Sequence, residues 1–184
     1  QKALALTTFA CAWRPSEATL IKVKHVVINE DFAIFTELGH KTDDMSGARV
    51  RVERARNAST CPVRATEAYL ARTKDLRQDE QESPLFLRLT GDRTVPLSAD
   101  SISNILTEAA RNAGLDPKVY TGRTYRPGFA TQAIAAGVDA SHAQQHGRWR
   151  SNDVFLNRYV NTVYQSDQTD RVLPTERPDH CVVS

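Results

Sequence analysis

A predicted helix begins in the stretch Gly122-Arg123-Thr124-Tyr125-Arg126 and runs to about residue 136, where Gly137 closes it. Arg123 and Arg126 are three residues apart, so both guanidinium groups can reach one face of this helix. The N-terminus of a helix favours an anion through its free N–H groups and its dipole. The stretch therefore indicates a phosphate-binding site, although arginines on a helix are often only solvated surface.

Further helical patterns lie on both sides of this segment. Apolar residues from Ala3 to Trp13 follow helical spacing, and Pro15 starts a second short helix because proline suits a first turn. Ser98 provides a cap, and Gly114 a stop, for another helix. The predicted helices cover about residues 3–13, 15–21, 62–73, 99–113, 124–136, 141–146 and 152–163.

A small sheet is predicted between the second and third helices. Residues 25–28 and 32–35 are apolar runs separated by a polar turn, which is typical of a hairpin. Val50 and Val52 alternate with charged residues as a third strand, after a turn-rich loop over residues 39–47. The predicted fold class is α+β, mainly α, with a three-stranded antiparallel sheet.

Length and composition favour one domain. The chain has 184 residues, of which 40% are hydrophobic and 25% charged, enough for a single well-packed core. No apolar run approaches the roughly 18 residues of a membrane-spanning helix, so no membrane partner is expected. Three cysteines without a CxxC spacing indicate neither a disulfide framework nor a zinc site. Because the chain opens at Gln1 without a signal segment, we expect a fragment of a longer protein.

Positive charge gathers in the last third of the chain. The net charge is only +2, from 24 Lys and Arg against 22 Asp and Glu. Residues 118–159 nevertheless hold six basic side chains and two acidic ones. This local excess favours a polyanionic partner for the segment that carries the Arg123–Arg126 pair.

Motifs in the first fifty residues resemble the tyrosine recombinase (phage integrase) family. Arg14 and Glu17 resemble its first-arginine motif, in which an acidic residue follows the arginine by three positions. Lys41 resembles the catalytic lysine, because it lies on the loop between the second and third predicted strands.

Later motifs follow in the order that this family has. Arg123 and Arg126 resemble its His-x-x-Arg motif, with arginine in place of histidine. Trp149 stands in the His/Trp position, and Tyr159 falls where the family has its nucleophile. Tyr159 lies ten positions after Trp149, a slightly long spacing that leaves Tyr164 as the alternative nucleophile.

The resemblance implies a domain organisation and partners. Residues 1–164 would form the catalytic domain and residues 165–184 a C-terminal tail, with a DNA-clamping domain expected before Gln1. The implied partners are double-stranded DNA and a homotetramer on two DNA sites, with no cofactor or metal. Cys61-Pro62-Val63 and Gly147-Arg148-Trp149 are most similar in wording to recombinases of crypton and DIRS-type mobile elements. The expected location is intracellular: nuclear for a eukaryotic host, cytoplasmic for a bacterial or phage source.

Cutting a phosphodiester without metal requires a nucleophile, a clamp for the non-bridging oxygens and an acid for the leaving 5′ oxygen. The resemblance assigns the clamp to Arg14 and Arg126 and the acid to Lys41. It assigns the attack to Tyr159, which would hold the DNA as a 3′-phosphotyrosine and so conserve bond energy without ATP.

Supporting roles and alternatives complete the hypothesis. Trp149 would donate its indole N–H beside the phosphate, and Glu17 would orient Arg14. Arg123 stays protonated, so it cannot transfer a proton as histidine does. An inactive, domesticated DNA-binding module of the same fold therefore stays open, as does a type IB topoisomerase-like strand transferase. Tyr159 could also be a packing residue at helical spacing from Phe155.

Overall fold

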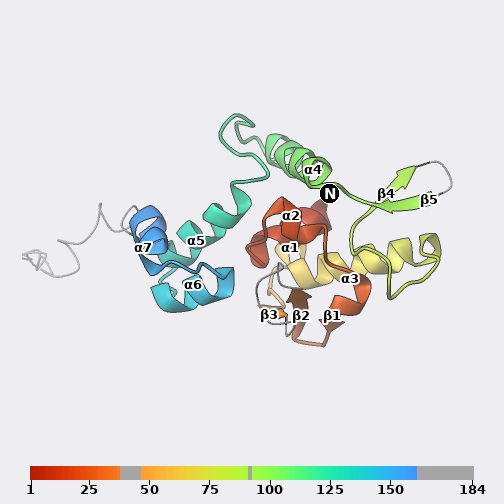
Figure 1. Cartoon of the computed structure of the whole chain (residues 1–184), viewed down its shortest axis with the longest axis horizontal. Helices are drawn as coiled ribbons and strands as arrows, with labels where there is room; N and C mark the ends of the chain where they lie inside the picture. The colour runs from red at the N-terminus through yellow and green to blue at the C-terminus, as the bar shows by residue number, and fades with distance from the viewer. Residues whose placement is uncertain (38–46, 91–92, 161–184) are drawn as a thin grey trace, which may run out of the picture.

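The computed structural model describes residues 1–37, 47–90 and 93–160, which are mainly helical, with a small antiparallel sheet beside the helix Pro62–Thr73 (Figure 1). No helix within these ranges is long and apolar enough to cross a membrane. The α-helices are α1 (Lys2–Ala10), α2 (Pro15–Ala18), α3 (Pro62–Thr73), α4 (Ala99–Asn112), α5 (Tyr125–Ala135), α6 (Ala140–Gly147) and α7 (Asn152–Phe155). Single 3₁₀ turns cover Val23–His25, Ala58–Thr60 and Lys74–Leu76, and a π-helical turn covers Leu156–Val160.

Side-chain caps explain where several of these helices begin. Ser98 Oγ accepts from Ser101 N at the start of α4, and Asp139 Oδ1 accepts from Ser141 N at the start of α6. Pro62 occupies the first turn of α3, as expected for a residue without an N–H. The helices predicted over 62–73, 99–113, 124–136 and 141–146 are confirmed, with ends that differ by one residue at most.

The first helix ends earlier than predicted. Helix α1 stops at Ala10, and Ala12 adopts a left-handed conformation with φ 51°. Ala12 N donates to Phe9 O and Trp13 N donates to Thr8 O, which is the Schellman pattern of a helix C-terminus. The expectation of a helix to Trp13 was wrong because alanine, rather than glycine, occupies the left-handed position. This stop turns Trp13 away from the α1 axis.

The three-stranded sheet is confirmed, with the order β1 (Val26–Ile28), β2 (Phe32–Glu37), β3 (Ala48–Glu53). Both pairings are antiparallel, and Phe35 lies opposite Val26 on one side and Val50 on the other. Side chains alternate in β2, so Ala33 and Phe35 are buried on one face. Glu37 continues this phase, and an acidic side chain therefore points inward at the end of β2.

A second hairpin, β4 (Leu87–Thr90) with β5 (Arg93–Pro96), was missing from the sequence prediction. Each strand has only four residues, which is too short for periodicity to identify. The alternation Leu87-Arg88-Leu89-Thr90 was the available signal.

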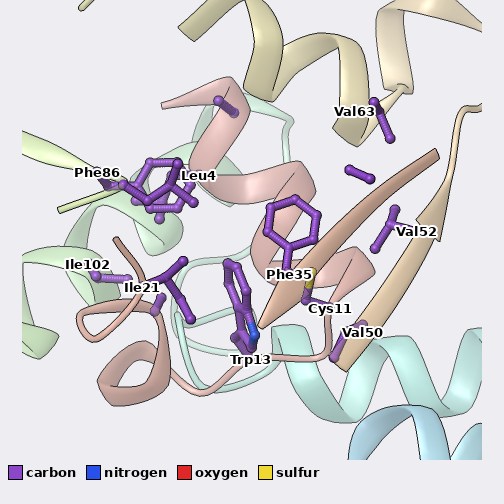
Figure 2. Packing of buried hydrophobic residues seen from close by; sticks show 14 of the residues in the cluster. Leu4, Cys11, Trp13, Ile21, Phe35, Val50, Val52, Val63, Phe86 and Ile102 are labelled. Atoms are coloured by element: carbon purple, nitrogen blue, oxygen red, sulfur yellow. The ribbon is translucent and has the colours of Figure 1, made fainter. Parts of the chain in front are cut away.

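The buried apolar residues form two groups. The larger group, shown in Figure 2, joins α1, the sheet, α3 and α4, and its centre includes Trp13 packed edge-on against Phe35 at 5.4 Å. The smaller group joins α5, α6 and α7 through Ala130, Ile134 and Phe155. The ion pairs of Arg126 with Glu17 and of Arg148 with Glu37 link the segments that carry the two groups.

Candidate active site

Arg14 lies immediately after the Schellman turn, as the N-cap of α2. Its backbone N–H donates to Glu17 Oε2 at 2.8 Å, and its Nη1 donates to Glu17 Oε1 at 2.6 Å. The Arg14 side chain is still 58% exposed. Glu17 therefore holds the guanidinium in place and leaves its other donors open to a ligand.

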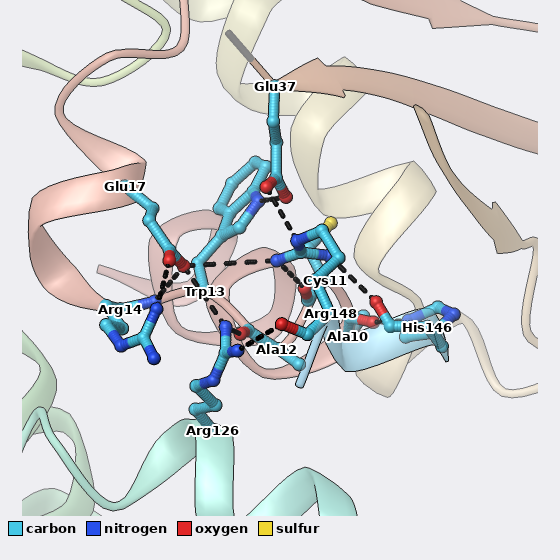
Figure 3. A network of polar contacts seen from close by, with 10 residues as sticks. All are labelled: Ala10, Cys11, Ala12, Trp13, Arg14, Glu17, Glu37, Arg126, His146 and Arg148. Carbon is cyan, nitrogen blue, oxygen red and sulfur yellow. Dashed lines mark hydrogen bonds and ion pairs between the residues drawn. The ribbon is translucent and has the colours of Figure 1, made fainter. Parts of the chain in front are cut away.

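Arg126 reaches the same carboxylate from α5 (Figure 3). Its Nη1 donates to Ala12 O at 3.0 Å and to Glu17 Oε2 at 3.3 Å, and its Nη2 donates to Arg148 O at 3.3 Å. Arg126 Nε is buried and has no hydrogen-bond partner within the described part of the chain. Burial lowers the pKa of Arg126 to about 10, so it stays charged at neutral pH.

Trp149 connects Arg126 to Tyr159. The Arg126 guanidinium carbon lies 4.5 Å from the centre of the Trp149 ring, a cation–π distance. Trp149 in turn packs on Tyr159 with ring centres 5.4 Å apart, and both rings contact Phe155. Tyr159 lies in the π-helical turn, and one aromatic ring separates it from the buried arginine.

Gly147 allows this arrangement of Trp149. A Cβ at residue 147 would lie 1.6 Å from Cζ3 of the indole, so no other residue fits under the ring. The Gly147-Arg148-Trp149 sequence thus has a packing reason, because the indole folds back over the end of α6.

Three further residues were predicted for the site, Arg123, Lys41 and Tyr164. Arg123 lies in the turn before α5, and its side chain is exposed. Lys41 and Tyr164 lie outside the described residues. The structure therefore brings together Arg14, Glu17, Arg126, Trp149 and Tyr159.

The sequence analysis missed two residues of the same polar network, Glu37 and Arg148. Arg148 Nε lies 2.7 Å from Glu37 Oε2, and Arg148 Nη2 lies 3.9 Å from Glu17 Oε2. Glu37 Oε1 also accepts a hydrogen bond from Trp13 Nε1. The signal for Glu37 was its position in the buried phase of β2, where an acidic side chain requires a partner.

An ordinary ion pair lowers the pKa of its carboxylate, whereas burial raises the pKa of Glu37. Removal from water raises it to about 7, although the Arg148 charge and the Trp13 hydrogen bond both favour the ionised form. The carboxylate of Glu37 is thus only weakly stabilised by its surroundings, and it titrates near neutrality.

We predict that Glu37→Gln removes a pH dependence of stability. The folded state binds more protons than the unfolded state between about pH 4.5 and 7, because folding raises the pKa of Glu37. The free energy of unfolding of the parent protein should fall through this window, while that of the variant stays flatter. One pKa unit corresponds to about 1.4 kcal/mol. As the pH rises through this window, the free energy of unfolding of the parent should therefore fall by on the order of 3 kcal/mol more than that of the variant.

Urea unfolding at about pH 5 and about pH 8 measures this difference. Glu53→Gln is the matched control, since its carboxylate is 65% exposed in an ion pair with Arg51. The control should differ little from the parent at either pH. A Glu37→Gln variant that becomes less stable than the parent as the pH rises would contradict the raised pKa.

The helices and the small sheet have the arrangement of a tyrosine recombinase catalytic domain, and the two arginines that share Glu17 are those that the motifs of this class assign to phosphate binding. The chain matches the Phage integrase family over residues 1–166, and it belongs to that family. The resemblance predicted from the motifs is thereby confirmed. The narrower likeness to crypton and DIRS-type elements stays a prediction.

Individual relatives agree with this assignment. An integrase/recombinase xerD homolog of Selenomonas ruminantium is 29% identical over 163 residues, which cover 86% of this chain and 46% of the relative. This chain therefore spans about half the length of that relative. The division into a domain over 1–164 and a tail over 165–184 stays a prediction, as does the preceding DNA-clamping domain.

Solved structures share the fold. The XerH site-specific recombinase, in a post-cleavage complex with a palindromic difH substrate, has a TM-score of 0.69 at 16% identity, covering 89% of this chain and 42% of that one. The Tn1549 transposon integrase, in complex with transposon right end DNA, has a TM-score of 0.62 at 18% identity, covering 86% and 53%.

Proposed function

We propose that this chain is the catalytic domain of a site-specific DNA recombinase or integrase, which cleaves and rejoins DNA through a 3′-phosphotyrosine on Tyr159. The observation that carries the proposal is the clamp formed by Arg14 and Arg126 on one carboxylate, with Arg126 and Glu17 lying 109 residues apart in sequence. Folding thus assembles at one point two donors that are positively charged at neutral pH, as binding of a phosphodiester requires.

The two arginines would bind the non-bridging oxygens of the phosphate. Arg14 has exposed donors, and the buried Nε of Arg126 is a donor that no described residue uses. These charges stabilise the negative charge that develops on phosphorus substituents in the transition state.

Tyr159 would supply the nucleophile. Its phenolic oxygen loses its proton to solvent water and forms a bond to phosphorus, while the bond from phosphorus to the 5′ oxygen breaks. Lys41 donates the proton that the leaving 5′ oxygen takes. The reverse attack by a 5′ hydroxyl releases Tyr159 and rejoins the strand. Bond energy is conserved in the phosphotyrosine, so rejoining needs no ATP, and the arginines and Lys41 would supply the charge stabilisation and the proton without a metal ion.

The remaining site residues support these steps. Glu17 orients both arginines, and Trp149 packs between Arg126 and Tyr159. Arg123 adds positive charge at the exposed entrance to α5, without a proton-transfer role because it stays protonated.

The proposed partners are double-stranded DNA and further copies of the protein, as a homotetramer on two sites. The DNA complexes of XerH and the Tn1549 integrase support DNA binding by this fold. An enzyme acting on DNA would work inside the cell, in the nucleus of a eukaryote or in the cytoplasm of a bacterium.

A nicked suicide DNA substrate tests this function. Such a substrate loses a short fragment on cleavage, so the covalent intermediate accumulates and appears as a shifted band on a denaturing gel. We expect an adduct without added metal or ATP. DNA binding without an adduct would instead support the inactive binding module, and relaxation of supercoiled DNA without recombination would support a type IB topoisomerase.

A further inference from the structure

Arg148 has an unusual backbone and an unusually complete set of contacts. It follows α6 in a left-handed conformation with φ 57°, which non-glycine residues rarely adopt. Its Nη2 donates to Cys11 O at 3.1 Å and its Nη1 donates to His146 O at 2.8 Å, beside the Glu37 ion pair. These contacts hold the backbone of Arg148 at one place.

That backbone is itself part of the arginine clamp. The carbonyl oxygen of Arg148 accepts the hydrogen bond from Arg126 Nη2, and the next residue, Trp149, stacks on the Arg126 guanidinium. The position of Arg148 therefore sets two of the contacts that orient Arg126.

Glu37 fixes Arg148 from the opposite side. Its Oε1 accepts from Trp13 in the larger apolar core, while its Oε2 pairs with Arg148 at the edge of the smaller one. Figure 3 shows Arg148 between Glu37 and the carbonyl groups at the end of α1. One carboxylate thus joins the sheet to the segment that carries Trp149.

We propose that the ion pair between Glu37 and Arg148 positions Arg126, so that Glu37 and Arg148 are positioning residues for the cleavage reaction. This inference rests on the proposed function, because it concerns the same phosphate clamp. Glu37 must be ionised to perform this role.

The position of Glu17 explains why the charge of Glu37 matters. Arg148 Nη2 lies 3.9 Å from Glu17, which makes Glu17 its next carboxylate. When Glu37 is neutral, Arg148 is drawn towards Glu17 and competes there with Arg14 and Arg126. Arg14 and Arg126 then lose their orientation towards the phosphate, although both side chains are still present.

A contribution to stability alone does not account for this pair. A buried ion pair often adds little net stability, because desolvation offsets the Coulomb attraction. Desolvation raises the pKa of Glu37 to about 7 against the opposing effect of the Arg148 charge, in line with this balance. The groups that set it are Trp13, Arg148, Glu17 and Arg126, and Cys11 lies close enough to be affected by Glu37 in turn.

Single-turnover cleavage of the nicked substrate by Glu37→Gln tests the proposal, with Glu53→Gln as the exposed control. At about pH 8.5 the Glu37→Gln variant should cleave roughly 10-fold more slowly than the parent, because a misoriented clamp reduces the rate by such factors. Its affinity for the DNA should change less than about twofold. Urea unfolding accompanies the rates, because removing one partner of a buried pair leaves the Arg148 charge uncompensated.

The pH profile separates positioning from a merely structural role. The ratio of parent to variant rates should fall from roughly 10 at about pH 8.5 towards 1 at about pH 5.5, where Glu37 of the parent is protonated. Other titrating groups are common to both proteins and cancel in the ratio. Equal rates at the higher pH, or a ratio that does not vary with pH, would overturn the proposal.

A double-mutant cycle with Arg148→Gln gives an independent measurement. If Glu37 acts through Arg148, the double variant should be no slower than the slower single variant, whereas independent effects would multiply. A parent protein that forms no adduct at any pH would refute the proposed function instead, so the two failures are distinguishable.

Discussion

Tyr159→Phe abolishes the covalent adduct on the nicked substrate and leaves the affinity for DNA within about twofold. The phenolic oxygen is the atom that forms the bond to phosphorus, so its removal stops the reaction rather than slowing it. Affinity depends mainly on basic side chains that contact the phosphates, and none of these changes. The ring of Tyr159 packs on Trp149 and Phe155, and phenylalanine preserves that packing.

The experiment compares parent, Tyr159→Phe and Tyr120→Phe on the same gel. Tyr120 is 45% exposed in the segment before α5 and serves as the matched control, which should form the adduct normally. An adduct that persists in Tyr159→Phe would assign the nucleophile to Tyr164. Loss of DNA binding together with the adduct would mean that the hydroxyl has a structural role.

The sequence predicted most elements that local rules determine. Helix α3 begins with Pro62, and α4 follows the Ser98 cap, so both were predictable to within one residue. The three-stranded sheet was predictable from the alternation of Val50 and Val52 with charged neighbours. The stop after Ala10 was not, because the left-handed residue of its Schellman turn is alanine.

The site residues also fall into two sets, those that sequence motifs predicted and those that only the folded structure reveals. Arg14, Glu17 and Arg126 were predicted from motifs, and the structure shows them in contact. No motif assigned a role to Glu37 or Arg148, and their pairing depends on how β2 meets the segment after α6. A contact between residues so distant in sequence follows from tertiary packing, which local patterns do not contain.

Arg126→Ala should lower the cleavage rate by roughly 10²-fold or more, as the loss of one preorganised donor to a developing charge does. Arg126→Lys should restore little of this loss. The guanidinium donates to Ala12 O and Glu17 from Nη1 and to Arg148 O from Nη2, which one ammonium group cannot reproduce. The cleavage rate at saturating DNA should fall by a larger factor than the affinity for DNA.

Because Arg126 is buried, circular dichroism and urea unfolding must accompany these rates, and Arg14→Ala provides a second test. The Arg14 side chain is 58% exposed, so its removal should leave the fold intact and still reduce cleavage by a similar factor. Arg111→Ala is the control, because Arg111 is an exposed arginine of α4 paired with Glu108. If Arg14→Ala and Arg126→Ala both cleaved as fast as Arg111→Ala, neither arginine would bind the reacting phosphate, and the shared Glu17 contact would be structural only.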